Sequence, residues 1–240
     1  MKRVLVDQLA PVGALLEPDS EECHHLIRVR RIKPGEMLEI LDGHGGLALG
    51  EVTTVNRNQV VLRVTETLEA RRESPLQLTV AAAIPSQLNT FDSVLPGLVQ
   101  MGVTRFYLVP TAFGGRMKKS PERYVPRLET IIRQSLKQCG RTTAPSLTLL
   151  KDWPTLCTRL AEENEANVVF HPVEDKTEVA TGCTRLSLLI GPEGGFSDEE
   201  VALAKEQGFV IRGLGPRILK METALIACTS WAQSQYGDLS

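Results

Sequence analysis

The chain has 240 residues, of which 42% are hydrophobic and 23% charged, and its formal net charge is -2. This length suits one large domain or two modest ones with a core of normal size, and the balanced charge excludes a globally basic, histone-like binder of nucleic acid. The apolar run Val4–Val6 is too short for a signal peptide, and no segment approaches the roughly 20 apolar residues of a membrane span. We therefore expect a cytoplasmic protein.

Cysteine usage argues against both disulfides and a zinc site. The five cysteines are odd in number and scattered, with no C-x-x-C pair and no paired histidine spacing; they are Cys23, Cys139, Cys157, Cys183 and Cys228. We expect reduced, mostly buried thiols and no bound metal.

Residues 1–69 are typical of a small β-barrel. Short strands are predicted at Met37–Leu41, Leu47–Val55 and Gln59–Val64, with a tight turn at Gly43–Gly46 between the first two. Closely spaced short strands favour a barrel. A helical stretch that begins at Asp19 or Ser20 and carries Cys23, Leu26 and Ile27 is expected to plug or flank it.

A basic cluster follows this helical stretch. Arg28, Arg30, Arg31 and Lys33 lie close together with no acid between them. Such cations suit contacts to RNA phosphates, which fix position rather than read sequence. A solvated helix end before the Pro34–Gly35 turn explains the same residues equally well.

Beyond a charged linker at residues 70–75, strands alternate with helices over residues 76–240. Strands are predicted at Leu76–Ile84, Arg105–Pro110, Asn167–His171, Leu186–Ile190 and Phe209–Ile211. Helices are predicted at Phe91–Gln100, in a long segment that ends at Cys139–Gly140, and from Met221 onward. This alternation predicts an α/β domain with a parallel sheet covered on both faces. Pro96 and Pro126 are expected to end, kink or delay their helices.

Charge is uneven within this second region. Between Pro110 and Arg141 only Glu122 and Glu129 oppose a series of cations, which are Arg116, Lys118, Lys119, Arg123, Arg127, Arg133, Lys137 and Arg141. By contrast, residues 161–178 are acidic. A bipolar surface can bind an anionic polymer on one face despite a near-neutral total charge, so RNA binding is favoured over a merely solvated helix face.

Two glycine-proline loops each follow a strand and precede a helix. Gly191–Phe196 follows Leu186–Ile190 and leads into the S-x-x-E capping box of Ser197 and Glu200, and Gly213–Arg217 precedes the helix from Met221. Ligands bind at the carboxyl ends of parallel strands, where both loops fall. Either loop alone is equally consistent with an ordinary turn.

The composition of these loops restricts the ligand. There is no P-loop lysine motif and no G-x-G-x-x-G followed by an acid, which disfavours nucleoside triphosphates and dinucleotides. Arg217 is the only cation within the loops, and Lys220 lies just beyond. Loops rich in backbone groups and poor in cations suit a neutral or positively charged nucleoside.

The loop sequences also carry a family resemblance. Leu189-Ile190-Gly191-Pro192-Glu193-Gly194-Gly195-Phe196-Ser197 and Leu214-Gly215-Pro216-Arg217-Ile218-Leu219, followed by Glu222-Thr223-Ala224, resemble the paired signature loops of the RsmE family. Arg72–Leu76, Gln138–Arg141 and Gly237–Leu239 also match. The resemblance covers essentially the whole chain, including a barrel similar to the PUA domain.

The resemblance implies a fold and a reaction. The fold is a SPOUT α/β domain with a deep trefoil knot over residues 76–240, preceded by a PUA-like barrel over residues 1–69, in a homodimer. The reaction is S-adenosylmethionine-dependent methylation of N3 of a specific uridine in 16S rRNA of the small ribosomal subunit. The implied cofactor-binding residues are Leu189, Ile190, Gly191, Pro192, Glu193, Gly194, Gly195, Leu214, Gly215, Ile218, Leu219, Thr223 and Ala224.

The chemistry suggests roles for a few side chains. Arg217 is the candidate to stabilise charge on a uracil carbonyl, and Glu222 or Glu193 is the candidate base for the N3 proton. Ordinary structural roles are the alternatives: Glu193 and Glu222 as caps, and Arg217 in an ion pair. The expected RNA contacts are Arg28, Arg30, Arg31, Arg116, Lys118, Lys119 and Arg141.

The sequence departs from the family pattern in places. Ser86–Asn89 and Gln100–Val103 replace the usual residues around the second helix, Lys137 stands where an acid is usual, and Met221 where a threonine is common. These departures leave two other functions open. One is a methyltransferase of the same fold that acts on another RNA, and the other is a non-catalytic RNA-binding protein.

Overall fold

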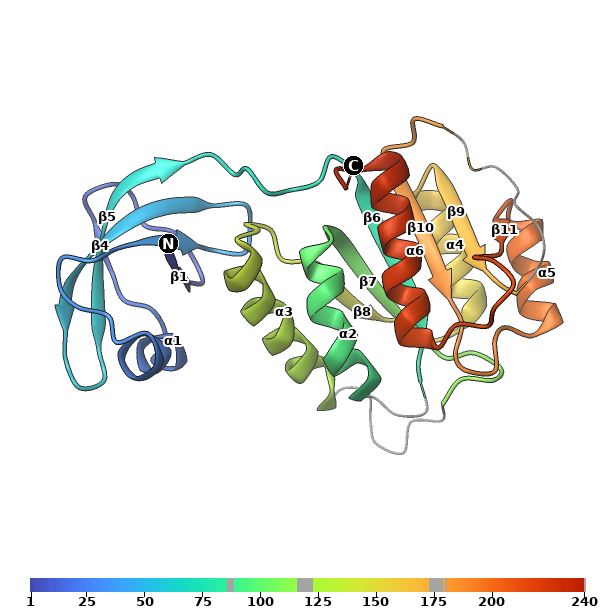
Figure 1. Ribbon diagram of the computed structural model, residues 1–240, viewed down its shortest axis with the longest axis horizontal. Helices are drawn as coiled ribbons and strands as arrows, with labels where there is room; N and C mark the ends of the chain where they lie inside the picture. Colours follow the sequence, from blue (N-terminus) through green and yellow to red (C-terminus); the bar gives the residue numbers. More distant parts are fainter. Residues whose placement is uncertain (86–88, 116–122, 173–178, 180, 240) are drawn as a thin grey trace. The chain divides into compact units, whose positions relative to one another are not determined.

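The computed structural model describes residues 1–85, 89–115, 123–172, 179 and 181–239 (Figure 1). The chain forms two compact units. The first contains Met1–Glu73 and Arg133–Ala144, and the second contains Ser74–Ile132 and Pro145–Ser240. The junction after Glu73 lies in the predicted linker, whereas Arg133–Ala144 packs with the first unit although we expected it in the α/β domain.

The first unit is built on one five-stranded sheet in the order β1-β3-β4-β5-β2. Its strands are β1 (Lys2–Leu5), β2 (Leu15–Leu16), β3 (Met37–Leu41), β4 (Leu47–Val55) and β5 (Val60–Leu68). β1 pairs with β3 in parallel, and the other pairs are antiparallel. The predicted β-rich unit is confirmed. The edge strands β1 and β2 do not pair with each other among the described residues, so hydrogen bonding between strands does not close the sheet into a complete barrel.

The predicted helical stretch covers this sheet as α1 (Ser20–His24) followed by a π-helical turn, η1 (His25–Val29). The Asp19 side chain caps α1 by accepting a hydrogen bond from the backbone N–H of Glu22. Cys23 and Leu26 point inward and join a core with side chains of β1, β3, β4 and β5. The helix therefore supplies the apolar side chains that fill the curved face of the sheet.

Two ion pairs explain why residues 133–144 belong to the first unit. The Arg141 guanidinium donates to Glu73 at 2.9 Å, and Glu73 also accepts from the backbone N–H groups of Thr142 and Thr143. Lys137 donates to Glu22, a carboxylate whose residue is only 6% exposed. The unusual lysine at position 137 is thus matched by a buried acid within the same unit.

The second unit contains a six-stranded, wholly parallel sheet in the order β11-β9-β10-β6-β7-β8. Its strands are β6 (Gln77–Ala83), β7 (Val103–Val109), β8 (Ser146–Leu149), β9 (Ala166–Phe170), β10 (Arg185–Ile190) and β11 (Val210–Arg212). The helices are α2 (Asn89–Gln100), α3 (Val125–Cys139), which runs from this unit into the first, α4 (Trp153–Glu163), α5 (Asp198–Glu206) and α6 (Met221–Tyr236).

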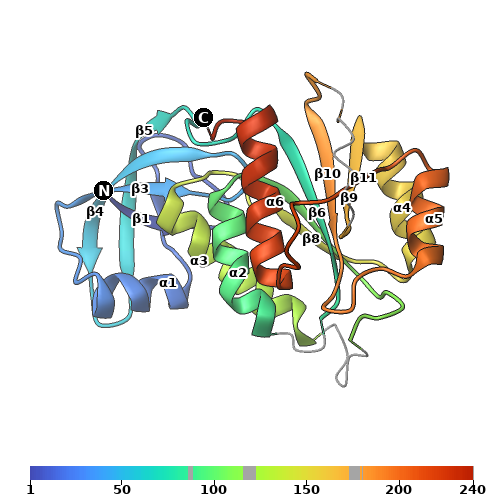
Figure 2. The ribbon, with the colours of Figure 1, turned by 45° about the vertical axis from the view of Figure 1, so that its right-hand side comes forward.

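Helices cover both faces of this sheet, as the sequence predicts (Figure 2). On one face, Val80 and Leu108 line a small apolar cavity together with Leu95 of α2 and Leu225 of α6. On the other face, side chains of the same strands pack against Trp153 and Leu156 of α4 and against α5. Alternate residues of each strand therefore enter two separate cores, which explains why the strands are nearly continuous in apolar residues.

Several expectations about the elements need correction. Pro96 does not end α2, which continues to Gln100, because Phe91, Leu95 and Leu98 bury the apolar face of this helix. The expected delay at Pro126 is confirmed, because α3 begins at Val125 and Pro126 lies in its first turn, where the missing N–H costs nothing. The strands β1, β2 and β8 and the helix α4 were not predicted. Among the described residues, no helix has the length and apolar character needed to cross a membrane.

The Glu22–Lys137 pair leads to a stability prediction. Replacement of Lys137 by Met leaves the buried carboxylate without a partner and should lower the free energy of unfolding by about 3–5 kcal/mol. Urea unfolding followed by circular dichroism measures this change. The control is Lys2→Met, which removes a pair with Glu36 whose side chains are each 33% exposed and should cost less than about 1 kcal/mol. Equal losses for the two variants would contradict the prediction.

Candidate functional site

Three strands of the second unit end side by side. The Cα register pairs Phe170 of β9 with Ile190 of β10 on one side and with Arg212 of β11 on the other. The chain leaves all three strands at the same edge of the sheet, so the loops that begin at Gly191 and Gly213 flank His171. The register thus brings together two glycine loops that are distant in sequence.

A cavity lies at this edge. It is walled by the end of β9, by both loops and by one face of α6. The lining residues are Phe170, His171, Pro172, Ile190, Gly191, Pro192, Glu193, Gly195, Leu214, Gly215, Arg217, Ile218, Leu219, Met221, Ala224 and Cys228. The lining combines apolar side chains with exposed backbone, which is typical of a small-molecule site.

Glycine shapes the first loop. Gly195 has φ +75° and donates its N–H to the carbonyl of Pro192 at 2.9 Å, which closes a tight turn. A Cβ atom on Gly191 would lie 3.2–3.3 Å from atoms of Gly195 and Phe196, so a side chain there would crowd the turn. The loop is then anchored by Phe196, which is buried and packs on Trp153 with ring centroids 4.7 Å apart.

The carboxylate of Glu200 fixes the end of the same loop. One oxygen accepts from the backbone N–H of Ser197 at 2.9 Å, and the Ser197 hydroxyl accepts from the N–H of Glu200, which completes the predicted capping box. The other oxygen accepts from the N–H of Ala112 at 2.7 Å. Glu200 therefore also ties the loop after β7 to the loop after β10.

The second loop is more exposed. Gly215 has φ +98°, and the side chain of Ile218 is 85% exposed. Lys220 is the N-cap of α6 but makes no side-chain capping bond. Met221, Ala224 and Cys228 then present one helical face to the cavity.

The cavity carries little fixed charge. Arg217 and Glu193 are the charged lining residues, and both are exposed. In the described part of the chain neither makes a hydrogen bond or ion pair, so the expected structural roles as partner and cap are not observed. The Nδ1 atom of His171 is buried and has no hydrogen-bond partner among the described residues. A site with one arginine suits a neutral or cationic nucleoside rather than a polyphosphate.

Most of the predicted cofactor-binding residues line this cavity. The exceptions are Leu189, Gly194 and Thr223. The Leu189 side chain is buried in the core with Trp153 and Phe196, so only its backbone can face a ligand. The two catalytic candidates from the sequence lie in different places. Arg217 lines the cavity, whereas Glu222 lies in the first turn of α6 outside the lining.

Sequence reasoning missed five lining residues, which are Phe170, His171, Pro172, Met221 and Cys228. The predicted strand that ends at His171 was a usable signal, since strand ends carry ligands. Helical spacing from Ala224 also points to Met221 and Cys228. Burial raises the pKa of the Cys228 thiol above its ordinary value, so this group stays protonated and forms an inert wall.

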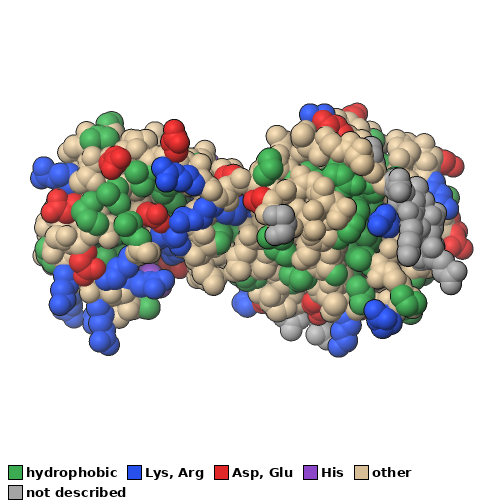
Figure 3. Space-filling view, turned by 45° about the horizontal axis from the view of Figure 1, so that its top comes forward, with side chains coloured by type: hydrophobic (Ala, Val, Ile, Leu, Met, Phe, Trp, Pro, Cys, Tyr) green, Lys and Arg blue, Asp and Glu red, His purple; other side chains and the backbone are tan. Residues whose placement is uncertain are grey.

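The predicted RNA contacts fall into three groups. Arg28, Arg30 and Arg31 are exposed on the first unit, where Figure 3 shows many Lys and Arg side chains. Arg116, Lys118 and Lys119 lie outside the described residues. Arg141 is only 2% exposed and its guanidinium is bound to Glu73. A buried, paired arginine is not available to a phosphate, so we withdraw Arg141 from the candidate contacts.

A second cavity in the first unit lies beside the basic cluster. Its lining includes Lys2, Arg3, His25, Arg30 and Lys137. Burial and the Lys137 ammonium lower the pKa of His25, so its neutral ring can accept the hydrogen bond that the Nε atom of Arg30 donates at 3.3 Å. Lys2, Arg3 and Lys137 are paired with carboxylates, whereas the exposed Arg30 makes no ion pair among the described residues and has donors left for an anion.

Neither a metal centre nor a disulfide is found in the described residues. No group of three or more His, Cys, Asp or Glu side chains is positioned to hold a metal ion there. The cysteines are free thiols, and all except Cys139 are buried, as predicted.

Comparison with known proteins identifies the family. An RNA methyltransferase domain matches residues 72–233, and an RNA methyltransferase PUA domain matches residues 18–65. The ribosomal RNA small subunit methyltransferase E of Mycobacterium bovis is 30% identical, over 91% of this chain and 86% of the relative. The chain belongs to the RsmE family of RNA methyltransferases.

Other members agree with this assignment. The ribosomal RNA small subunit methyltransferase E of Buchnera aphidicola is 28% identical over 99% of this chain and 98% of its own. Among solved structures, a putative methyltransferase from Legionella pneumophila, in complex with the bound cofactor SAM, is 30% identical and has a TM-score of 0.90. The match covers 99% of this chain and 98% of that protein. The RsmE fold, with a PUA domain before an α/β domain, therefore extends over the whole chain.

Proposed function

We propose that this RsmE family enzyme transfers a methyl group from S-adenosylmethionine to N3 of a specific uridine in 16S rRNA. The observation that carries the proposal is the cavity at the aligned ends of β9, β10 and β11, formed by the two glycine loops. The Legionella pneumophila relative, 30% identical, was solved with bound SAM. We further propose that the protein acts in the cytoplasm, as a homodimer with a knotted α/β domain.

The cavity chemistry fits this cofactor. Backbone groups of Gly191, Gly195 and Gly215 supply donors and acceptors for a nucleoside, and Ile190, Leu219 and Ala224 supply apolar walls. Among the described residues, the lining has no cluster of lysine or arginine, which favours a ligand with a positive centre. When bound, S-adenosylmethionine supplies an electrophilic methyl group on a sulfonium. The chain's own contribution is to hold the uracil in line with it.

Arg217 is the side chain best placed to act on the uracil. It lines the cavity, is exposed at the rim, and has no acidic partner among the described residues. Its guanidinium can donate hydrogen bonds to a uracil carbonyl, where negative charge develops as N3 loses its proton. The same group also attracts the anionic substrate to the rim.

The proton on N3 requires an acceptor. Glu193 lines the cavity and is exposed, whereas Glu222 lies outside the lining in the first turn of α6. Glu193 is therefore better placed than Glu222, and His171, whose ring also lines the cavity, is a further candidate. The target uridine must be unpaired or flipped out, because base pairing hides N3.

We propose that 16S rRNA, within the small ribosomal subunit, is bound by the basic cluster of the first unit. Arg28, Arg30 and Arg31 are exposed side chains on one short segment, and such cations contact phosphates rather than bases. The cluster therefore positions the RNA, while the choice of base falls to the cavity and its rim.

Mass-spectrometric mapping of 16S rRNA from a strain that lacks the protein tests the function. We expect one N3-methyluridine to disappear, and purified enzyme with S-adenosylmethionine should restore it on unmethylated small subunits or naked RNA. Restoration on only one of these substrates identifies the natural one. Loss of a methyl group from a different RNA would favour another methyltransferase, and binding of RNA without any turnover would favour a non-catalytic protein.

Arg217→Ala should lower kcat about 100- to 1000-fold, the usual loss when one donor to a developing oxyanion is removed. Steady-state kinetics measures the rate, and calorimetry should show cofactor affinity within about twofold of the wild type. Lys205→Ala is the matched control, since it removes an exposed cation of α5 that does not line the cavity. Near-normal turnover of Arg217→Ala would exclude the catalytic role.

Alanine substitutions at two glycines with similar backbone conformations can distinguish an effect on cofactor binding from an effect on protein stability. Gly195 (φ +75°) and Gly208 (φ +80°) both have room for a Cβ atom, but only Gly195 lines the cavity. Alanine should cost about 1–2 kcal/mol of stability at either position. Only Gly195→Ala should also weaken binding of S-adenosylmethionine, by about tenfold or more, because it distorts the turn that faces the ligand. Similar cofactor affinities in the two variants would contradict the proposed site.

A further inference from the structure

An exposed phenylalanine stands at the loop that follows β7. Phe113 is 58% exposed, and it is the one aromatic ring among the large hydrophobic side chains that the described residues expose. A single exposed hydrophobic side chain is normal on a protein surface, so the surroundings of the ring must decide whether it has a partner. The function assigned to the two glycine loops does not use it.

The backbone on both sides of Phe113 is held in place. The N–H of Ala112 donates to Glu200 at 2.7 Å, and Glu200 is itself only 9% exposed. The N–H of Gly115 donates to the carbonyl of Ile84 at the end of β6 at 2.8 Å, and the N–H of Gly114 donates to the carbonyl of Thr111 at 3.1 Å. The ring is thus carried by a braced loop, which reduces the entropy lost when it binds a partner.

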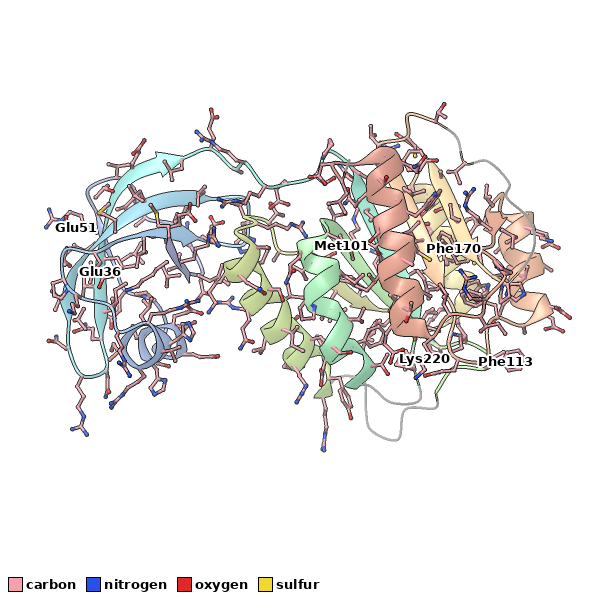
Figure 4. All side chains as sticks on the ribbon, in the orientation of Figure 1. Glu36, Glu51, Met101, Phe113, Phe170 and Lys220 are labelled. Carbon is pink, nitrogen blue, oxygen red and sulfur yellow. The ribbon has the colours of Figure 1, made fainter. Side chains whose placement is uncertain are left out.

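Phe113 lies against the first glycine loop. Its Cβ atom is 2.9 Å from the position that a Cβ atom on Gly194 would occupy, so the phenylalanine packs directly on the backbone of Gly194. The neighbours of that glycine, Glu193 and Gly195, line the cavity. Figure 4 shows Phe113 at the same end of the second unit as Lys220. The ring therefore belongs to the rim of the cavity.

The rest of the rim indicates the kind of partner. Leu214 and Ile218 expose apolar side chains beside the cavity, and the exposed cations Arg217 and Lys220 lie in the same loop and at the start of α6. A partner that matches both features has a flat apolar face next to negative charge. A base of single-stranded RNA, with its phosphate, has this chemistry, and bases stack on exposed aromatic rings in many RNA-binding proteins.

We propose that Phe113 is a stacking platform for an RNA base at the mouth of the cavity, held in position by Glu200. The proposal rests on the proposed function, because it takes RNA to be the substrate that approaches this edge. Stacking is tolerant of sequence, since every base has a π face. Phe113 therefore holds the substrate strand against the rim while the cavity selects the reacting base.

Three substitutions test stacking against simple apolar contact. Phe113→Ala removes the ring, Phe113→Leu keeps an apolar side chain without a π face, and Phe113→Tyr keeps the ring. Binding to unmethylated 16S rRNA should weaken about 5- to 150-fold for the Ala and Leu variants, and the Tyr variant should stay within about threefold of the wild type. Calorimetry should give unchanged affinity for S-adenosylmethionine, and sedimentation should give an unchanged oligomeric state.

Each contrary result overturns the proposal in a distinct way. Wild-type RNA affinity in Phe113→Leu would mean that the ring acts only as an apolar contact, and wild-type affinity in Phe113→Ala would mean that it makes no contact with RNA. A change in oligomeric state would assign Phe113 to an interface between copies of the chain, and a parallel loss of cofactor affinity would assign it to loop structure. RNA binding without methylation by the wild type would instead refute the proposed function and leave the stacking measurement valid.

Discussion

The site depends on the parallel register of β11, β9 and β10. Because Arg212, Phe170 and Ile190 are aligned, three loops leave the sheet at one edge and enclose a common volume. The register is strongly fixed, since neighbouring strand residues such as Val168 and Leu188 are fully buried, and a shift by one residue would move every side chain to the opposite face. The hydrophobic cores on the two faces of the sheet therefore determine where backbone groups converge on a ligand.

Glu200 extends this constraint to the neighbouring strands. Its carboxylate joins the helix cap at Ser197 to the backbone of Ala112, and Gly115 in turn is bonded to Ile84 at the end of β6. One buried acid thus links the loops after β7 and β10 across the strand that separates them. A capping residue, whose usual effect is local, here determines the shape of the cavity rim.

Patterns among neighbouring residues predicted most of the strands and helices of the α/β domain. They could not predict contacts between residues that are far apart in the sequence. The apolar runs of β6 and β10 and the capping box of α5 were readable because neighbouring residues carry the whole signal. The short edge strands β2 and β8 gave too few residues for a pattern, although Asp152 followed by Pro154 was an available signal for the missed helix α4. The error at Arg141 has another cause: its partner, Glu73, is 68 positions away, and no local pattern reveals such a pair.

The electrostatics of the two expected ligands explain how the chain distributes its cations. A positively charged sulfonium is disfavoured by clustered cations, whereas RNA phosphates require them. The cavity lining accordingly has one arginine, placed at the exposed rim, while Arg28, Arg30 and Arg31 lie together on the surface of the first unit. Other cations of the first unit are neutralised by carboxylates, as in the Lys137–Glu22 and Arg141–Glu73 pairs. Counting basic residues along the sequence therefore overstates the surface open to RNA, and burial decides which of them are available.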